Sequence, residues 1–212
     1  IGPFAVLGLT AQPIGPLQAV GKRAFDLVIA GSALAILAPL MVIVAVLIKL
    51  DSRGPVLFRQ RRLGYNQREF RILKFRTMTT LDDGAHVRQA TRNDSRVTRV
   101  GRWLRRFNLD ELPQLFNVVM GQMSLVGPRP HAVAHDVHFE TRILDYPRRL
   151  NVKPGITGWA QIHGLRGATE TEEDMRRRVV YDIHYIENWS LVLDLYILML
   201  TVISPKAYRN AY

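Results

Sequence analysis

Two adjacent carboxylates, Asp110 and Glu111, are the residues of this sequence best suited to phosphate chemistry. Pro113 is tolerated only in the first turn of a helix, so the pair is expected at or near a helix N-terminus, where free N–H groups attract phosphate. Neighbouring helical residues point about 100° apart, which favours separate tasks. One carboxylate can attack phosphorus, and the other can hold Mg²⁺ beside substrate phosphates. A simple helix cap is the alternative that the residues leave open.

The composition favours a polyanionic partner. The 212 residues include 29 Lys+Arg and 18 Asp+Glu, which gives a formal net charge of +11. Such a balance suits nucleic acid, an anionic membrane or a phosphorylated small molecule. Cysteine is absent, which excludes disulfides, a thiolate nucleophile and a cysteine-ligated metal.

A charge-free run from Leu27 to Ile48 predicts a membrane segment, because a helix of this length covers roughly 33 Å, about one hydrocarbon core. Lys22 and Arg23 precede the run, and Lys49 follows it. Positive charge on both flanks suits a segment that enters and leaves by the same face, with its turn at Pro39. A proline-kinked spanning helix is equally compatible with these residues.

The membrane run, and the absence of any recognised nucleic-acid module, argue against nucleic acid as the partner.

Other segments have simpler patterns. Residues 1–21 contain prolines and glycines without charge until Lys22, which predicts a linker or the end of an upstream region, and the start at Ile1 indicates a piece of a longer protein. Residues 70–75 alternate as in a strand. Residues 97–107 predict an amphipathic helix with a cationic face that suits anionic lipid. Residues 191–203 are apolar but too short to span, which predicts a core or interfacial helix.

Several motifs in this order resemble the bacterial sugar transferase family, the monotopic polyprenyl-phosphate phosphoglycosyl transferases. They are KRAFDL, LAPLM, KFRTM, LDELPQLFNVVMGQMSLVGPRP, KPGITGWAQ and YDIHYIENWSLVLDL. The resemblance covers roughly residues 22–212. It implies transfer of a sugar 1-phosphate from a UDP-sugar to undecaprenyl phosphate, with UMP as the leaving group. The path that it implies runs through a phosphosugar on an aspartate and needs Mg²⁺.

The resemblance also assigns residues. Asp110 matches the nucleophile, Glu111 matches the residue that holds Mg²⁺, and the two carboxylates together form the expected metal site. Pro39 matches the break of a re-entrant helix, which tips the topology toward re-entry. The matches to substrate-binding positions are Lys74, Arg105, Arg129 and, with a less defined role, Asp182.

The implied architecture is α/β but mostly helical. It has an end of an upstream region (1–21), a re-entrant helix–break–helix segment (22–50) and a small globular catalytic domain with interfacial amphipathic helices (51–212). The implied location is the cytoplasmic face of the bacterial inner membrane. The expected partners are UDP-sugar, undecaprenyl phosphate and membrane lipid, without nucleic acid, and a homodimer is allowed.

The sugar is the least determined part of the prediction. Residues 163–182 and the C-terminal NAY resemble hexose-type members, and glucose is favoured over galactose. His163 and Ala168 depart from the residues usual in such members, in the loop where sugar preference could be set. The predicted role is to initiate exopolysaccharide, capsule or O-antigen synthesis. The alternative is a non-catalytic scaffold that binds anionic lipid through its arginines.

Overall fold

The computed structural model of the chain describes residues 14–80, 94–167 and 171–204. The helices are α1 (Pro16–Asp51), α2 (Arg99–Arg106), α3 (Gln114–Val119), α4 (Val133–Glu140), α5 (Trp159–Ile162), α6 (Glu172–Glu187) and α7 (Leu191–Ile203). The strands are β1 (Leu57–Leu63), β2 (Glu69–Phe75), β3 (Ser124–Val126) and β4 (Gly155–Thr157). Short 3-10 turns are η1 (Tyr65–Gln67), η2 (Leu109–Glu111) and η3 (Tyr146–Asn151). The mostly helical α/β class predicted from the sequence is confirmed.

Helix α1 is the one described helix that is long and apolar enough to cross a membrane, with a mean hydropathy of 2.7 in its most apolar window. It begins at Pro16, a residue suited to the first turn, and Gln18 accepts a hydrogen bond from the Gly15 N–H at 3.0 Å. The predicted linker therefore does not extend to residue 21, because residues 16–21 are helical. Residues 1–13 lie outside the described part.

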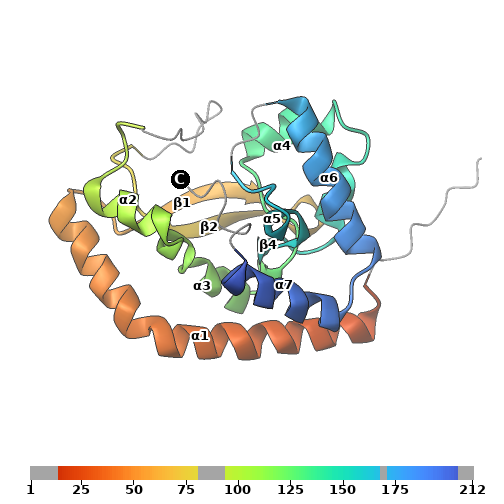
Figure 1. Cartoon of the computed structure of the whole chain (residues 1–212), viewed down its shortest axis with the longest axis horizontal. Helices are drawn as coiled ribbons and strands as arrows, with labels where there is room; N and C mark the ends of the chain where they lie inside the picture. The colour runs from red at the N-terminus through yellow and green to blue at the C-terminus, as the bar shows by residue number, and fades with distance from the viewer. Residues whose placement is uncertain (1–13, 81–93, 168–170, 205–212) are drawn as a thin grey trace, which may run out of the picture.

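The predicted break at Pro39 does not interrupt the helix, since α1 is continuous from Pro16 to Asp51 with Pro39 inside it. Figure 1 shows α1 running along one side of the molecule and then turning. Proline removes one helix hydrogen bond and is a usual cause of such bends.

Both ends of α1 are fastened to the same globular body. Near the N-terminal end, Arg23 donates to the carbonyl oxygens of Val118 and Val119, at 2.6 and 2.7 Å. Near the C-terminal end, the Asp51 carboxylate accepts from the Val100 N–H at 3.1 Å, and Arg76 donates to the Ser52 carbonyl at 2.7 Å. The helix is thus tied to the globular part on both sides of its bend.

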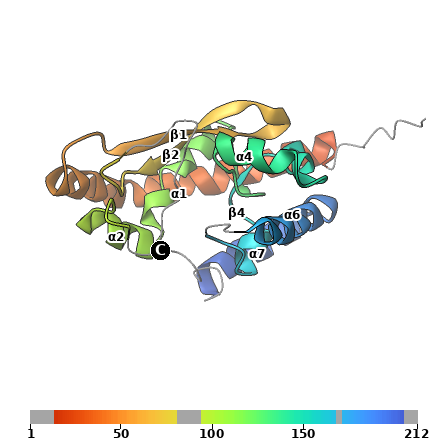
Figure 2. The same ribbon diagram turned by 90° about the horizontal axis from the view of Figure 1, so that it is seen from above.

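Strands β1 and β2 form an antiparallel hairpin with Leu57 opposite Phe75 and Leu63 opposite Glu69. The predicted strand at 70–75 is confirmed. The buried Asn117 of α3 holds the hairpin, because its side chain accepts from the Leu73 N–H at 2.9 Å and donates to the Arg71 carbonyl at 2.8 Å. Seen from above, the hairpin lies on the opposite side of the molecule from α6 and α7 (Figure 2).

Strands β3 and β4 pair in parallel through a very close approach of two glycine backbones. A Cβ on Gly127 would lie 2.5 Å from the Lys153 carbonyl oxygen, and one on Gly155 would lie 2.1 Å from the Gly127 nitrogen. Only glycine fits there, since real Cβ atoms do not approach so closely. This contact fixes the start of the loop that follows β3.

The amphipathic helix predicted at residues 97–107 is confirmed as α2. Its apolar residue Leu104 is fully buried in a cluster with Val44, Ile48 and Phe75 of α1 and β2. Trp103 and Phe107 are exposed, with ring centroids 5.1 Å apart. Contact of the cationic face with lipid stays a prediction.

Candidate active site

Asp110 and Glu111 lie in η2, immediately before α3. Asn108 precedes this turn with a left-handed backbone (φ 55°), a conformation that asparagine tolerates better than most residues. Pro113 is the residue before the first turn of α3. The predicted position near a helix N-terminus is confirmed, although α3 is short.

The Glu111 carboxylate contacts three cationic side chains. The Lys74 ammonium lies 3.0 Å from Oε1, and the Arg166 guanidinium lies 3.1 Å from Oε2. Arg129 donates to both oxygens, to Oε1 and at 3.3 Å to Oε2. We call these three residues with Glu111 the clamp. It brings β2, the loop after β3 and the loop after α5 to one carboxylate.

The electrostatics keep Glu111 charged. Burial alone would raise its pKa, but Arg129, Lys74 and Arg166 together hold the pKa well below its usual value. Burial also lowers the pKa of Lys74, and the Glu111 charge opposes that shift. One carboxylate against three cations leaves a surplus of positive charge, which is the arrangement that attracts phosphate.

Asp110 has the opposite surroundings, although it is the next residue. Burial raises its pKa above the usual value, which Lys74 opposes and Glu111 reinforces. No hydrogen bond or ion pair joins its carboxylate to another described residue. The two neighbours therefore differ in their contacts: three cations hold the Glu111 carboxylate, whereas the Asp110 carboxylate has no hydrogen bond to a described residue.

Arg105 borders Asp110 from α2. Its Nε donates to the Thr77 hydroxyl at 2.9 Å, and its charge acts on Asp110. Gly101 permits this contact, because a Cβ there would lie 2.2 Å from the Thr77 carbonyl oxygen. Thr98 begins the helix by accepting a hydrogen bond from the Gly101 N–H at 2.9 Å. The guanidinium thus has a fixed place beside the uncommitted carboxylate.

Asp182 does not join this group. It is 2% exposed in α6 and pairs with the Arg149 Nε at 2.7 Å. Arg149 in turn donates to the Arg129 backbone carbonyl at 2.8 Å. The structure thus gives Asp182 an indirect link to the clamp and no open face for substrate.

Arg166 is the residue that sequence reasoning missed. It lies in the glycine-rich HGLRG stretch, where nothing signals a partner 55 residues earlier. His163 is exposed, and its ring centroid lies 4.3 Å from that of Trp159 and 5.0 Å from that of Tyr181. Ala168 and the C-terminal NAY lie outside the described residues.

Metal ligands are sparse in the site. Within residues 14–80, 94–167 and 171–204, no three His, Asp or Glu side chains group closely enough to hold a metal ion by themselves. Asp110 and Glu111 supply two carboxylates. Mg²⁺ often binds through one or two carboxylates together with substrate phosphates, so the donor set fits Mg²⁺ only when phosphate is bound.

Comparison with known proteins agrees with this chemistry. The bacterial sugar transferase family model matches residues 17–205. The chain is 53% identical to a UDP-glucose:undecaprenyl-phosphate glucose-1-phosphate transferase from Caulobacter vibrioides, over all of this chain and 80% of that protein. It is 51% identical to an undecaprenyl-phosphate glucose phosphotransferase from Komagataeibacter xylinus, over all of this chain but only 40% of that protein. It is 48% identical to an exopolysaccharide production protein from Rhizobium leguminosarum, over 89% of this chain and 96% of that protein.

Proposed function

The chain belongs to the bacterial sugar transferase family, and from this premise we propose that it transfers glucose 1-phosphate from UDP-glucose to undecaprenyl phosphate. The names of the relatives support glucose over galactose. The relative from Rhizobium leguminosarum supports a role in starting exopolysaccharide synthesis.

In the first step, an Asp110 carboxylate oxygen attacks the phosphorus that carries the glucose. A bond forms between this oxygen and phosphorus, while the bond from phosphorus to the bridging oxygen breaks. UMP leaves with the bridging oxygen and its electron pair. The product is glucose phosphate on the Asp110 carboxylate, an acyl phosphate.

In the second step, an oxygen of undecaprenyl phosphate attacks the same phosphorus. The bond to the aspartate oxygen breaks, which restores the Asp110 carboxylate and yields undecaprenyl diphosphate glucose. Both substrates carry phosphate, so one set of cations serves both steps.

The contrast between Asp110 and Glu111 is the observation that carries this proposal. A nucleophile needs a free lone pair, and Asp110 is the carboxylate without a hydrogen bond to any described residue. Glu111 instead gathers Lys74, Arg129 and Arg166. In this arrangement the three cations, with Arg105, stabilise negative charge on the transferring phosphoryl group and on UMP.

Mg²⁺ belongs to the same proposal. Asp110 and Glu111 would hold it together with phosphate oxygens of the UDP-sugar, and the metal would neutralise charge on the diphosphate. Because the Glu111 oxygens already meet three cations, we expect Mg²⁺ and UDP-glucose to bind together rather than the metal alone.

The decisive test is Asp110→Asn. We expect UMP release from UDP-glucose to fall by roughly 10⁴-fold or more, because the nucleophile is lost. Without acceptor lipid, the wild-type protein should gain the mass of a glucose phosphate, and the variant should not. Asp145→Asn is the matched control, since Asp145 is an exposed carboxylate paired with Arg148 at the surface. Normal turnover by Asp110→Asn would disprove the covalent path.

The same assay separates the alternative and identifies the sugar. A lipid-binding scaffold would release no UMP from any UDP-sugar, and its lipid binding would not change in Asp110→Asn. A panel of UDP-glucose, UDP-galactose and their N-acetylated forms, scored by UMP release, determines the substrate. A homodimer remains a prediction.

We also propose that α1 is re-entrant and that the catalytic part lies on the cytoplasmic face. Support comes from the hydrogen bonds that tie both ends of α1 to one globular body. A helix spanning the membrane would place one end on the far side, out of reach of that body. Cysteine-labelling at Ala19 and Arg53 from the cytoplasmic side alone is expected, and labelling from opposite sides would disprove re-entry.

A further inference from the structure

The two arginines of the clamp, Arg129 and Arg166, lie on loops. The backbone of each loop accepts a hydrogen bond from another arginine, which is buried. Arg149 donates through Nη2 to the Arg129 carbonyl oxygen at 2.8 Å. Arg178 donates through Nη2 to the Gly167 carbonyl oxygen at 3.0 Å, next to Arg166. The supporting arginines come from η3 and α6, so neither loop supports itself.

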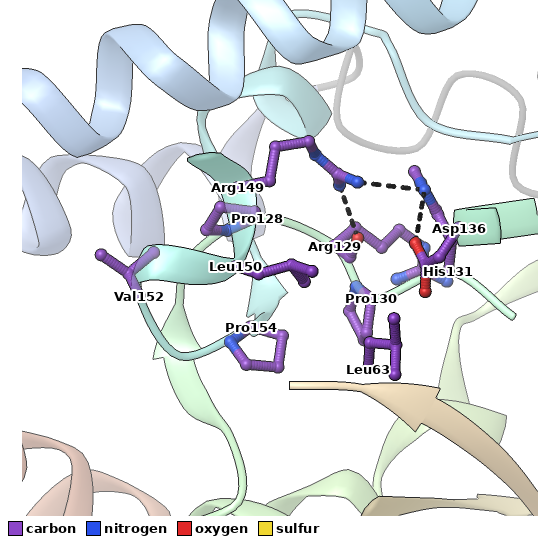
Figure 3. Close-up of a pocket in the computed structure, with 10 residues that line it drawn as sticks. All are labelled: Leu63, Pro128, Arg129, Pro130, His131, Asp136, Arg149, Leu150, Val152 and Pro154. Atoms are coloured by element: carbon purple, nitrogen blue, oxygen red, sulfur yellow. Dashed lines mark hydrogen bonds and ion pairs between the residues drawn. The ribbon is translucent and has the colours of Figure 1, made fainter. Parts of the chain in front are cut away.

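A single imidazole lies between these two supporting arginines. The Nδ1 atom of His131 is 3.1 Å from Arg149 Nη1, and its Nε2 atom is 3.2 Å from Arg178 Nη1. Figure 3 shows Arg149 between the Arg129 carbonyl and the His131 ring. His131 is 7% exposed, so water does not replace these contacts freely.

The hydrogen-bond partners determine which ring nitrogen carries the proton. The Tyr146 hydroxyl donates to the Asp136 carboxylate at 2.6 Å, so its oxygen is left to accept from His131 Nδ1 at 2.8 Å. Nε2 is then the acceptor for Arg178. A neutral ring with its proton on Nδ1 donates to Tyr146 and accepts from Arg178, while Arg149 Nη1 lies against the same Nδ1 as a contact without a hydrogen bond. A doubly protonated ring would turn an N–H toward Arg178 as well.

The charges around the ring require the neutral form. Burial and the neighbouring Arg149 and Arg178, with smaller effects of Arg62 and His135, hold the pKa of His131 well below its usual value. Asp182 balances Arg149 through their 2.7 Å ion pair. The Asp136 carboxylate lies 3.9 Å from His131 Nδ1, and the Tyr146 hydroxyl joins the two groups through its hydrogen bonds. The ring is therefore a neutral spacer between two like charges.

We propose that His131 is a positioning residue that couples the Arg129 loop to the Arg166 loop. It orients Arg178 by accepting its hydrogen bond and packs against Arg149, so the two loops present their arginines to Glu111 together. Its consequence for turnover rests on the proposed function, because the clamp is taken to bind the phosphates. The coupling of the loops does not rest on it.

Amide hydrogen exchange of the full chain in detergent micelles tests the coupling without any activity. In His131→Leu, exchange should accelerate in residues 127–131 and also in residues 164–167, which are distant in sequence. In His131→Gln, whose amide oxygen can accept from Arg178, the acceleration should be smaller. The matched control is Val44→Ala, which removes buried methyl groups from the separate cluster of α1, α2 and β2 and should affect neither segment. Acceleration confined to residues 127–131 would overturn the proposal.

Kinetics test the consequence. His131→Leu should lower kcat/KM for UDP-glucose by up to about 100-fold, the size expected when catalytic groups are misplaced by about 1 Å. The same substitution should cost only a few-fold in an Arg129→Ala, Arg166→Ala background, because its effect is transmitted through those side chains. Equal losses in both backgrounds would overturn the positioning role. If the wild-type chain released no UMP, the proposed function would fail while the exchange result still decided the coupling.

Discussion

The molecule buries two lysine–carboxylate pairs that differ in the balance of charge around them. In the clamp, Lys74 lies 3.0 Å from Glu111. Under α1, Lys22 lies 2.6 Å from Asp194 of α7. We call the second group the anchor. Both carboxylates are buried, so burial of charge by itself does not distinguish a functional site from a structural one.

In the anchor one cation pairs with one carboxylate, and both groups have further hydrogen-bond partners. Asp194 also accepts from the Tyr185 hydroxyl at 2.8 Å and from the Trp189 indole at 3.2 Å. Lys22 also donates to the Val126 carbonyl at 3.1 Å. In the clamp, by contrast, three cations contact the one carboxylate of Glu111, and the neighbouring Asp110 has no hydrogen bond to a described residue. A balanced group holds two helices together, whereas a group with surplus charge is ready for an anionic ligand.

The largest effect on stability is expected at the anchor. Asp194→Asn leaves the Lys22 charge buried without its partner and should cost roughly 3–5 kcal/mol of unfolding free energy. Thermal unfolding in detergent measures this loss. The double variant Lys22→Met, Asp194→Leu should recover most of it, because an apolar pair of similar volume avoids the desolvation penalty. A stable Asp194→Asn protein would show that the anchor does not hold α1.

Glu111→Gln should cost less stability, about 2 kcal/mol, because the clamp cations keep some contact with water. The variant keeps the shape of the side chain but removes the negative charge that pairs with Lys74, Arg129 and Arg166. Inorganic phosphate should therefore raise the unfolding temperature of Glu111→Gln more than that of the wild type. An equal shift in both proteins would contradict a surplus of positive charge. Asp194→Asn is the matched comparison and should show no added response to phosphate, because Lys22 is buried and donates to the Val126 carbonyl.

The smallest effect is expected in the pH dependence of kcat/KM and of unfolding. Asp110 attacks only when ionised, and burial raises its pKa above the usual 3.8, so kcat/KM should fall with decreasing pH at a point above 3.8. A raised folded pKa also means that ionisation of Asp110 weakens the fold as pH rises through that pKa. Asp110→Asn should therefore be at least as stable as the wild type at neutral pH.

Glu111 should show the reverse dependence, because its pKa is lowered. Its contribution to stability is present above the usual 4.5 and is lost as pH falls through the lowered pKa. Comparing the pH dependence of unfolding in Asp110→Asn and Glu111→Gln separates the two neighbours. A shared dependence would mean that they act as one coupled pair.

Local rules of the chain predicted several elements correctly. Alternation identified β2. The apolar pattern of residues 191–203 identified α7. Pro113 located the carboxylate pair at a helix start. Residues 16–21 are helical rather than linker, because Pro16 begins α1. Periodicity revealed the apolar face of α2 but not what covers it, which is α1 and β2.

The sequence by itself determined the local features and the family. It identified the apolar run, the helix start that presents Asp110 and Glu111, and the ordered motifs, because propensity, proline and hydrophobic period act over a few residues. Only the tertiary structure decided that Arg166 completes the clamp, that Asp182 acts through Arg149, and that Asp194 belongs to Lys22. These pairings join residues 33 to 172 positions apart, and they depend on how helices and loops pack. The chain has 29 Lys+Arg and 18 Asp+Glu, so many pairings of a cation with a carboxylate are possible, and the packing decides which of them form.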